Sequence, residues 1–387
     1  MEERRRSAKE RFDSLPWPVK TDEEWRRTDP ALIPQLPFEA KSTLRVDWEP
    51  ISSEAAKSGI LLTDLATALK QFPKLVEEHL FQSGLPQGLG KFVALHQWLS
   101  RQGLFCYVPD GVRVEIPLKS WMEVTRSGPV FPHLLLVAGR GSEVTLLDER
   151  RASAGLEPPV LSVEMAEIFA AQEAVVRYAR LQRWGSAVTE LFIQRARLQR
   201  DAQLLNIQVG MGSRLAKSSV ETVLDGTGCR SELLGIYFGS DQQHFDVHTL
   251  QDHQAPSTFS DLLYKSALIG QAKVVYTGLI RIAKQAQKSD AFQANRNLLL
   301  SQGTKADSMP KLEIEANDVR CTHGVAVGPV DPEQIFYLMS RGVPPPEAQR
   351  LLVEGFFEQV FKRIPMETLR EELMEEITRK LVLKKGE

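Results

Sequence analysis

The sequence contains little cysteine, almost no excess charge and no long apolar run. Its three cysteines, Cys106, Cys229 and Cys321, are an odd number at wide spacing, which argues against a disulfide framework and is typical of a reducing cytosol. A net charge of −2 provides no basic field to hold nucleic acid or an anionic membrane. Apolar runs such as Leu134 to Ala138 are far shorter than the ~20 residues that span a bilayer. We therefore expect a cytoplasmic protein with no nucleic-acid and no membrane partner.

Several signatures of secreted proteins and of enzymes are also missing. The charged N-terminus has no apolar segment behind it, so we expect no signal peptide. The chain has no Walker loop, which argues against ATP hydrolysis and against a bound nucleotide. It also has no G-x-G-x-x-G after a strand, no C-x-x-C and no G-x-S-x-G. These absences favour a protein that is not itself an enzyme.

The order of predicted helices and strands divides the chain into three regions. The composition is that of a globular protein, with 42% apolar and 25% charged residues. Short alternating segments typical of strands begin near Gly103 and continue to about residue 329. We predict a helical N-terminal region at 1–103, a mainly β core at 104–329 and a helical C-terminal region at 330–387. The N-terminal helices are expected at Glu2–Phe12, Thr63–Leu69, Phe72–Leu80 and Phe92–Ser100.

Small residues recur through the β region at a long period. Gly185, Gly212 and Gly239 are each followed by serine and are evenly spaced, and Gly270 follows after a slightly longer interval. We assign Gly141 to the same set and attribute the wider gap before Gly185 to a loop insertion around 150–159. A second set of small residues follows each later glycine at a nearly constant offset, at Ala202, Cys229, Ala255 and Ala286. Two tight corners per turn of about 27 residues predict a parallel β-solenoid with two strand segments per turn.

The alternation within the strands suggests which side chains fill the solenoid. In residues 175–181 and 204–209 we expect the apolar side chains to point inward and the polar side chains to point outward. The alternative is an irregular β-sandwich, whose hairpins would usually carry Asn-Gly or Asp-Gly turns. Asp225-Gly226 is such a pair, and it lies beside a predicted corner.

Three helices are predicted after the β region. Asp331-Pro332-Glu333 combines a capping aspartate with proline in the first turn, and Gly342 ends the first helix. A second helix is expected from Pro344 to about Ile364 and a third from Met366 to Lys384. The apolar stripe of the second helix is open to two interpretations, because it suits both packing on the end of the solenoid and docking of a partner.

Two polar groups could bind metal. His244, Asp246 and His248 share one face of a predicted strand, and His253 follows closely. We favour a structural role for this group, on an outer strand face or in a corner. The second group is Cys321 and His323, which lie on the same side of an extended segment and form an incomplete site that another chain could complete. The chemistry alone favours the alternative, a buried cysteine packed as a small hydrophobic residue beside a histidine that caps a turn.

Long segments of the chain resemble the SufB/SufD family, subunits of an iron–sulfur cluster assembly complex. The strongest resemblance lies in PKLEIEANDVRCTHGVAVG (residues 310–328) and in residues 331–342. Residues 243–246, 253–256, 295–301 and 23–28 are similar to family segments too, so that the resemblance covers nearly the whole chain. It implies a right-handed parallel β-helix between helical regions.

The resemblance also implies partners and site residues. A cysteine of the B subunit would fall at Asn295, so its absence favours the D subunit. His323 corresponds to a D-subunit histidine at the interface with B, which implies that iron or an iron–sulfur cluster is held transiently between the two chains, with Cys321 as a neighbour. The C-terminal helices would dock the SufC-like ATPase, and the isolated chain could form a homodimer. The docking residues expected are Gln334, Tyr337, Arg341, Leu351, Leu352, Phe356 and Phe357.

Two other solenoid proteins offer alternative functions. A β-helix carbohydrate lyase fits the repeat, but such enzymes are usually secreted and carry Asp and Arg clusters along a groove. A hexapeptide acyltransferase needs a six-residue period, which is far shorter than the period found here. We prefer the interpretation of the chain as an assembly scaffold.

Overall fold

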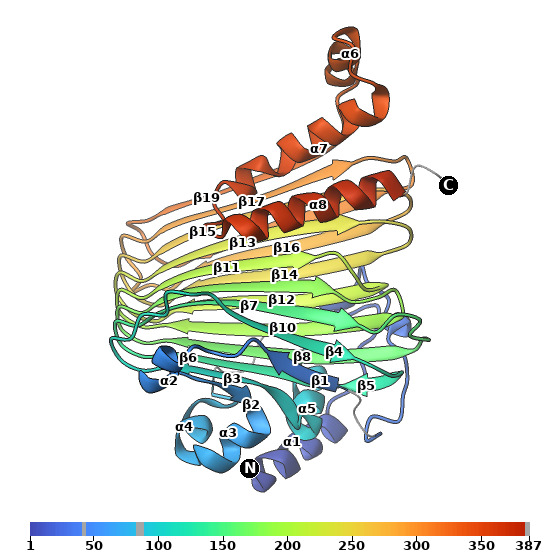
Figure 1. Ribbon diagram of the computed structural model, residues 1–387. Coiled ribbons are helices and arrows are strands. Elements are labelled where there is room, and N and C mark those ends of the chain that lie inside the picture. The colour runs from blue at the N-terminus through green and yellow to red at the C-terminus, as the bar shows by residue number, and fades with distance from the viewer. Residues whose placement is uncertain (41–43, 83–88, 384–387) are drawn as a thin grey trace.

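The computed structural model describes residues 1–40, 44–82 and 89–383, and its centre is a parallel β-solenoid (Figure 1). Two sheets form its walls. Sheet A contains, in spatial order, β1 (Leu44–Trp48), β4 (Leu118–Val124), β7 (Glu143–Ala152), β9 (Val175–Arg183), β11 (Gln203–Gly210), β13 (Arg230–Gly239), β15 (Phe259–Leu268), β17 (Asp290–Leu299) and β19 (Arg320–Pro329). Sheet B contains β18 (Lys305–Ile314), β16 (Lys273–Ile282), β14 (His244–His253), β12 (Leu215–Leu224), β10 (Val188–Leu198), β8 (Val160–Ala170), β6 (Pro132–Ala138), β3 (Gln102–Val108) and β2 (Leu61–Asp64), and the short β5 (Gly128–Val130) pairs with β8.

From β6 to β19 the chain alternates between the sheets, which confirms two strand segments per turn and a parallel solenoid. The length of a turn varies more than the repeat suggested. Gln203 of β11 pairs with Arg230 of β13, whereas Lys273 of β16 pairs with Lys305 of β18, so the later turn contains more residues than the earlier one. The parallel pairing excludes the β-sandwich alternative. The predicted period describes the middle turns, and longer corners extend the others.

One of the five predicted glycine corners, Gly141, lies on the other side of the solenoid from the rest. Gly185, Gly212, Gly239 and Gly270 all lie at corners that lead from sheet A to sheet B, as predicted. Gly141 instead lies between β6 and β7, at the corner from sheet B to sheet A. The segment between Gly141 and Gly185 therefore spans more than a full turn, ending at the opposite corner, rather than one turn with an insertion. Gly141 has φ of +61°, a conformation that glycine adopts without strain.

The predicted inward and outward faces of the strands in sheet A are right for some apolar residues and wrong for others. Tyr178 and Leu204 belong to the core between the sheets, and strand alternation places Arg180, Asn206 and Gln208 on the same inward face. The apolar neighbours on the other face pack in a second core outside sheet A, and they include Ala179, Leu181, Ile207 and Val209. Both faces of β9 and β11 are largely buried, so the apolar pattern could not identify the interior.

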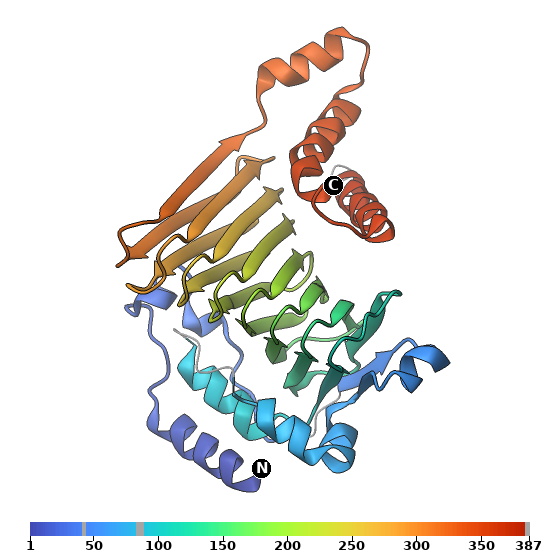
Figure 2. The same cartoon turned by 90° about the vertical axis from the view of Figure 1, so that its left-hand side faces the viewer.

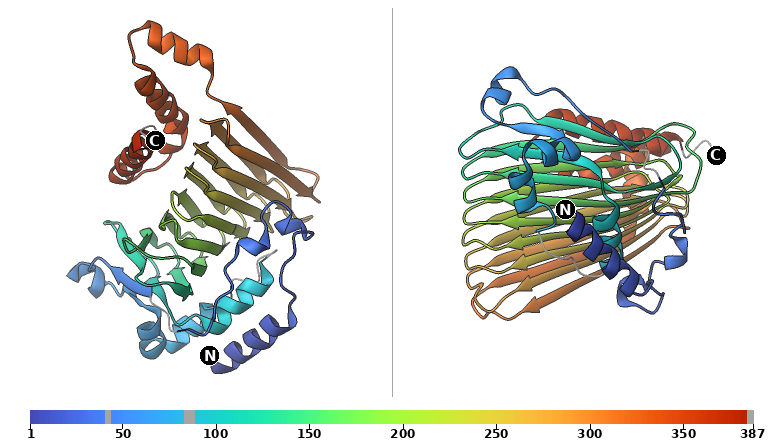
Figure 3. Two further views of the ribbon diagram at one scale, coloured as in Figure 1. Left: turned by 90° about the vertical axis from the view of Figure 1, so that its right-hand side faces the viewer. Right: turned by 90° about the horizontal axis from the view of Figure 1, so that it is seen from below.

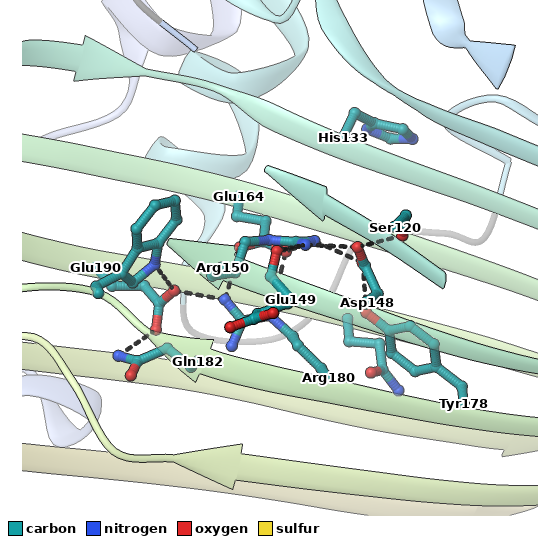
Figure 4. A network of polar contacts seen from close by, with 12 residues as sticks. Ser120, His133, Asp148, Glu149, Arg150, Glu164, Tyr178, Arg180, Gln182 and Glu190 are labelled. Atoms are coloured by element: carbon teal, nitrogen blue, oxygen red, sulfur yellow. Dashed lines mark hydrogen bonds and ion pairs between the residues drawn. The ribbon is translucent and has the colours of Figure 1, made fainter. Parts of the chain in front are cut away.

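Ion pairs allow charged side chains to lie inside the solenoid (Figure 4). Arg150 of β7 bridges Asp148 and Glu164, both at 2.6 Å. Arg180 of β9 contacts Glu164 of β8 at 2.6 Å and also pairs with Glu190 of β10. Burial alone would raise the pKa of Glu164, but the two arginines lower it to about 2, so this carboxylate stays ionised. Each of these buried charged groups thus has at least one oppositely charged partner.

Helices cover the outer faces of both sheets (Figures 2 and 3). The N-terminal helices pack on sheet B through Phe92, Val93 and Val76. They are α1 (Glu2–Ser14), α2 (Ser53–Lys57), α3 (Leu65–Gln71), α4 (Pro73–His79) and α5 (Gly90–Leu99), with short 3₁₀ helices at Glu23–Trp25 and Pro30–Leu32. β1 and β2 also come from this region and pair antiparallel with β4 and β3, which the prediction of a helical region did not foresee.

The C-terminal helices are α6 (Pro332–Ser340), α7 (Pro345–Phe361) and α8 (Glu367–Leu383). The Asp331 side chain accepts a hydrogen bond from the Glu333 amide, which confirms the predicted cap, and Lys384 lies outside the described residues. The buried side of α7, including Val353 and Val360, packs on the outer face of sheet A rather than on the end of the solenoid. Among the helices in the described ranges, none is long and apolar enough to cross a membrane.

Candidate functional site at the open end of the solenoid

The last turn of the solenoid leaves its interior open. β18 and β19 are the outermost strands of their sheets, and within the part of the chain that the structure describes no strand pairs with their free edges. Ile314, Val325 and Val327 are 41–43% exposed. Figures 1 and 2 show α6 projecting away from this end instead of covering it. The end therefore offers unpaired backbone groups and an apolar surface.

Cys321 and His323 point into this open interior. β19 pairs with β17 so that Cys321 lies opposite Ala291 and His323 opposite Gln293. Ala291 and Gln293 are buried on the inward face of β17, and the side chains of neighbouring parallel strands stack in register. Cys321 is half-buried and packs against a cluster that contains Ile280 and Ile282, whereas His323 is exposed. Both side chains thus line the mouth of the solenoid.

The pair does not form a complete metal site within this chain. Burial raises the pKa of the Cys321 thiol, and the negative charge of Asp290 raises it further. The thiol is therefore protonated at neutral pH, whereas a metal ligand must be a thiolate. Among the residues that the structure describes, no group of three or more His, Cys, Asp or Glu side chains is arranged to hold a metal. Further ligands would have to come from another molecule.

His244, Asp246 and His248 lie on the outer face of sheet B beneath the N-terminal segment. Asp246 forms an ion pair of 2.6 Å with Lys217 and accepts a hydrogen bond of 2.5 Å from Thr28. His248 contacts Asp246 at 2.9 Å and Glu24 at 3.1 Å. The lysine ammonium occupies the centre of the group, which suits a contact between segments and not a cation site.

The remaining histidine of this group lies on the opposite face of β14. The ring of His253 points into the solenoid, where its nitrogens lie 2.7 Å from the Thr258 hydroxyl and 2.8 Å from the Ser260 hydroxyl. Burial lowers the pKa of His253 to about 4, so the ring is neutral at pH 7. The structure therefore does not bring His253 together with His244, Asp246 and His248.

The predicted docking residues on the C-terminal helices differ in exposure. Gln334, Tyr337 and Arg341 are exposed on or just after α6, and Leu351 is exposed on α7. Leu352 and Phe356 are partly buried. Phe357 is fully buried against sheet A, so its side chain does not face solvent.

Two exposed apolar residues on α6 escaped the prediction. Phe336 is 72% exposed and Met339 is also exposed, and both belong to the apolar face of an amphipathic helix. The signal was present in the sequence as the helical spacing of these side chains.

Known proteins resemble the chain over most of its length. The model of the SufBD core domain, from the SUF system of iron–sulfur cluster assembly, matches residues 122–356. The iron–sulfur cluster assembly protein SufD of Bacillus subtilis is 28% identical over 335 residues, 86% of this chain and 76% of that protein. A SufBD family protein of Staphylococcus epidermidis is 29% identical over 83% of this chain and 69% of its own length. One from Mycobacterium leprae is 36% identical over 66% of this chain and 65% of its own length.

Proposed function

Because the chain belongs to the SufBD family of iron–sulfur cluster assembly proteins, we propose that it is a non-catalytic scaffold subunit that acts in the cytoplasm. In this role it joins a SufB-like subunit and a SufC-like ATPase, and it contributes to iron acquisition and cluster assembly. The similarity to the SufD protein of Bacillus subtilis supports the choice of subunit. The family match favours this function over the carbohydrate-lyase alternative.

The observation that carries the proposal is the position of His323 and Cys321 at the open mouth of the solenoid. Two ligands from one chain leave coordination positions free for a second chain. Iron or an assembling cluster is the cargo, held transiently between this chain and its SufB-like partner. The His323 imidazole supplies a nitrogen ligand in its neutral form, and the partner supplies thiolates. Cys321 contributes once the nearby metal has displaced its proton.

The edges of β18 and β19 supply the surface for that partner. A second solenoid can extend sheets A and B by pairing its own strands with these edges, which satisfies the unpaired backbone groups. The exposed Ile314, Val325 and Val327 would be buried in the same contact. Without the partner, a second copy of this chain occupies the same surface as a homodimer.

The ATPase docks on α6 and the start of α7. Phe336, Tyr337 and Met339 give α6 an exposed apolar face. Exposed apolar patches of this kind often mark a site of protein–protein interaction. Because this chain carries no Walker loop, ATP binding and hydrolysis belong to the separate subunit.

A His323→Ala variant tests the shared site. We expect it to fold and to co-purify with co-expressed SufB-like and SufC-like subunits, but to lower the iron and sulfide bound per complex at least tenfold, because a ligand is lost. Thr322→Ala is the matched control, since Thr322 is also exposed on β19 and points to the outer face. Full cluster content in the His323→Ala complex would refute the proposed site.

A further inference from the structure

Gln293 lies directly beneath His323 inside the solenoid. The two residues are paired in the register between β17 and β19, and both point inward. On its other side Gln293 pairs with Leu262 of β15. Paired residues on parallel strands stack at about 4.8 Å, so the glutamine side chain sits between a leucine and the exposed histidine. Gln293 itself is only 1% exposed.

The amide of Gln293 is only half satisfied. Its Nε2 donates a hydrogen bond of 3.3 Å to the Gly278 carbonyl on the opposite sheet. Its Oε1 is buried and has no hydrogen-bond partner among the residues that the structure describes. Burying an amide oxygen without a hydrogen-bond donor costs free energy, so a nearby N–H or O–H group that donated to this atom would stabilise the fold. The bond from Nε2 to a carbonyl also fixes which end of the amide is the oxygen.

The surroundings leave His323 as the fitting donor. Leu262 below has no polar hydrogen. Across the interior, the Tyr276 hydroxyl lies 3.0 Å from the Thr249 hydroxyl, where either group can donate, and it forms no hydrogen bond with Oε1. Gly278 leaves room for the amide, because a Cβ there would lie 2.6 Å from Oε1. His323, stacked above, carries a ring N–H in its neutral form.

We propose that Gln293 is a positioning residue for His323. The structure shows no bond between Oε1 and the exposed His323 ring, and a rotation of that ring would let one ring N–H donate to Oε1. This bond would fix the tautomer and turn the other ring nitrogen, with its lone pair, towards the mouth of the solenoid. Partners of this kind orient metal-binding histidines in many proteins and raise the basicity of the ligand. The inference rests on the proposed function, because it assigns the free nitrogen to iron or a cluster shared with the SufB-like partner.

The tautomer can be measured in the isolated full-length chain. With ¹⁵N-labelled histidine, long-range ¹H–¹⁵N spectra report which ring nitrogen carries the proton, and His323→Ala identifies the signal of His323. We expect a single hydrogen-bonded tautomer in the parent protein, a mixture of tautomers in Gln293→Leu, and recovery of the single tautomer in Gln293→Glu, which retains an acceptor. Asn295→Leu is the matched control, because Asn295 is a buried inward amide on the same strand but lies beneath Val325. Identical His323 signals in the parent and Gln293→Leu would overturn the inference and would leave Tyr276 as the donor.

Metal affinity separates this inference from the proposed function. In the complex with the SufB-like subunit, Gln293→Leu should weaken Co²⁺ binding about tenfold and Gln293→Glu should restore it, as for other partners of metal-binding histidines. If the tautomer depends on Gln293 but His323→Ala binds Co²⁺ as tightly as the parent, the positioning contact stands and the proposed shared site fails. If His323→Ala abolishes binding and Gln293→Leu changes neither readout, the shared site stands and the positioning role fails.

Discussion

At the residue scale, the buried ion pair of Lys217 and Asp246 ties the N-terminal segment to sheet B. Lys217 donates to the Glu24 carbonyl at 2.8 Å and lies 4.8 Å from the centre of the Trp25 ring. Burial alone would raise the pKa of Asp246. The charges of Lys217 and His248, together with their hydrogen bonds, outweigh this effect and hold the pKa well below its ordinary value of 3.8. The carboxylate is therefore ionised at neutral pH and needs its cation.

Lys217→Met should lower the free energy of unfolding by about 3 kcal/mol at pH 7, because it leaves a buried carboxylate without its ammonium partner. The measurement is urea unfolding followed by circular dichroism. In the parent chain, the ionised Asp246 stabilises the folded state at every pH above the ordinary pKa of an aspartate. This stabilisation is lost only when the pH falls through the much lower pKa that Asp246 has in the folded protein. In the variant the buried Asp246, deprived of the lysine charge, should take up a proton more readily.

The stability gap between the parent and Lys217→Met should therefore shrink as the pH is lowered from 7 towards 4. The double variant Lys217→Met/Asp246→Asn should recover much of the lost stability at pH 7, since it removes the unpaired charge. An unchanged urea midpoint in the single variant at pH 7 would show that this ion pair does not hold the segment.

At the scale of elements, the apolar side chains of α6 and α7 differ in their surroundings. Phe357 of α7 is 0% exposed in the core outside sheet A, whereas Phe336 of α6 is 72% exposed. Arg363, just after α7, anchors the helices through Glu232 at 2.8 Å and Asp261 at 2.9 Å on sheet A. The sheet thus holds α7 in place, and Phe336 stays exposed for the docking that we propose.

Phe357→Ala and Phe336→Ala form a matched pair with opposite expected effects. Phe357→Ala should lower the free energy of unfolding by about 3–5 kcal/mol, because it opens a cavity in a core. Phe336→Ala should change that free energy by less than about 0.5 kcal/mol, yet weaken binding of the SufC-like ATPase roughly tenfold or more. Urea unfolding and isothermal titration calorimetry measure the two effects. Tight ATPase binding by a well-folded Phe336→Ala protein would exclude this face of α6.

At the scale of the whole molecule, the solenoid is closed at one end and open at the other. The N-terminal region covers the first turns, and β1 and β2 pair antiparallel with the strands of sheets A and B there. At the far end β18 and β19 have free edges among the described residues. Proteins commonly cover or disrupt an exposed edge strand, so an uncovered edge with an apolar mouth indicates an interface.

Val325→Glu tests this end of the molecule. The side chain of Val325 points into the mouth and is 43% exposed, so a charge there should leave the free energy of unfolding nearly unchanged but weaken association with the SufB-like subunit at least tenfold, since a buried unpaired charge is costly. Analytical ultracentrifugation measures the association. Ala326→Glu places the same charge on the outer face of β19 and should associate normally. If Val325→Glu binds the partner as tightly as the parent, the open end is not the interface.

By itself, the sequence determined the periodic features of this protein. Small residues at tight corners predicted two strands per turn, since only compact side chains fit where turns stack. Asp331, Pro332 and Gly342 predicted the limits of α6 through local hydrogen bonds and backbone angles. The spacing of Cys321 and His323 placed both on one side of a strand. Each of these features depends on contacts close in sequence or on one repeated geometry.

Only the tertiary structure decided which face of each strand is the interior. The sequence predicted apolar residues inside, but α7 and α8 bury the outer face of sheet A as well, and ion pairs allow Arg150 and Arg180 inside. The tertiary structure also showed that Phe357 is buried whereas Phe336 is exposed, and it placed Gln293 beneath His323. These outcomes depend on partners far away in the chain, whose approach is set by the packing of the whole fold and not by local pattern.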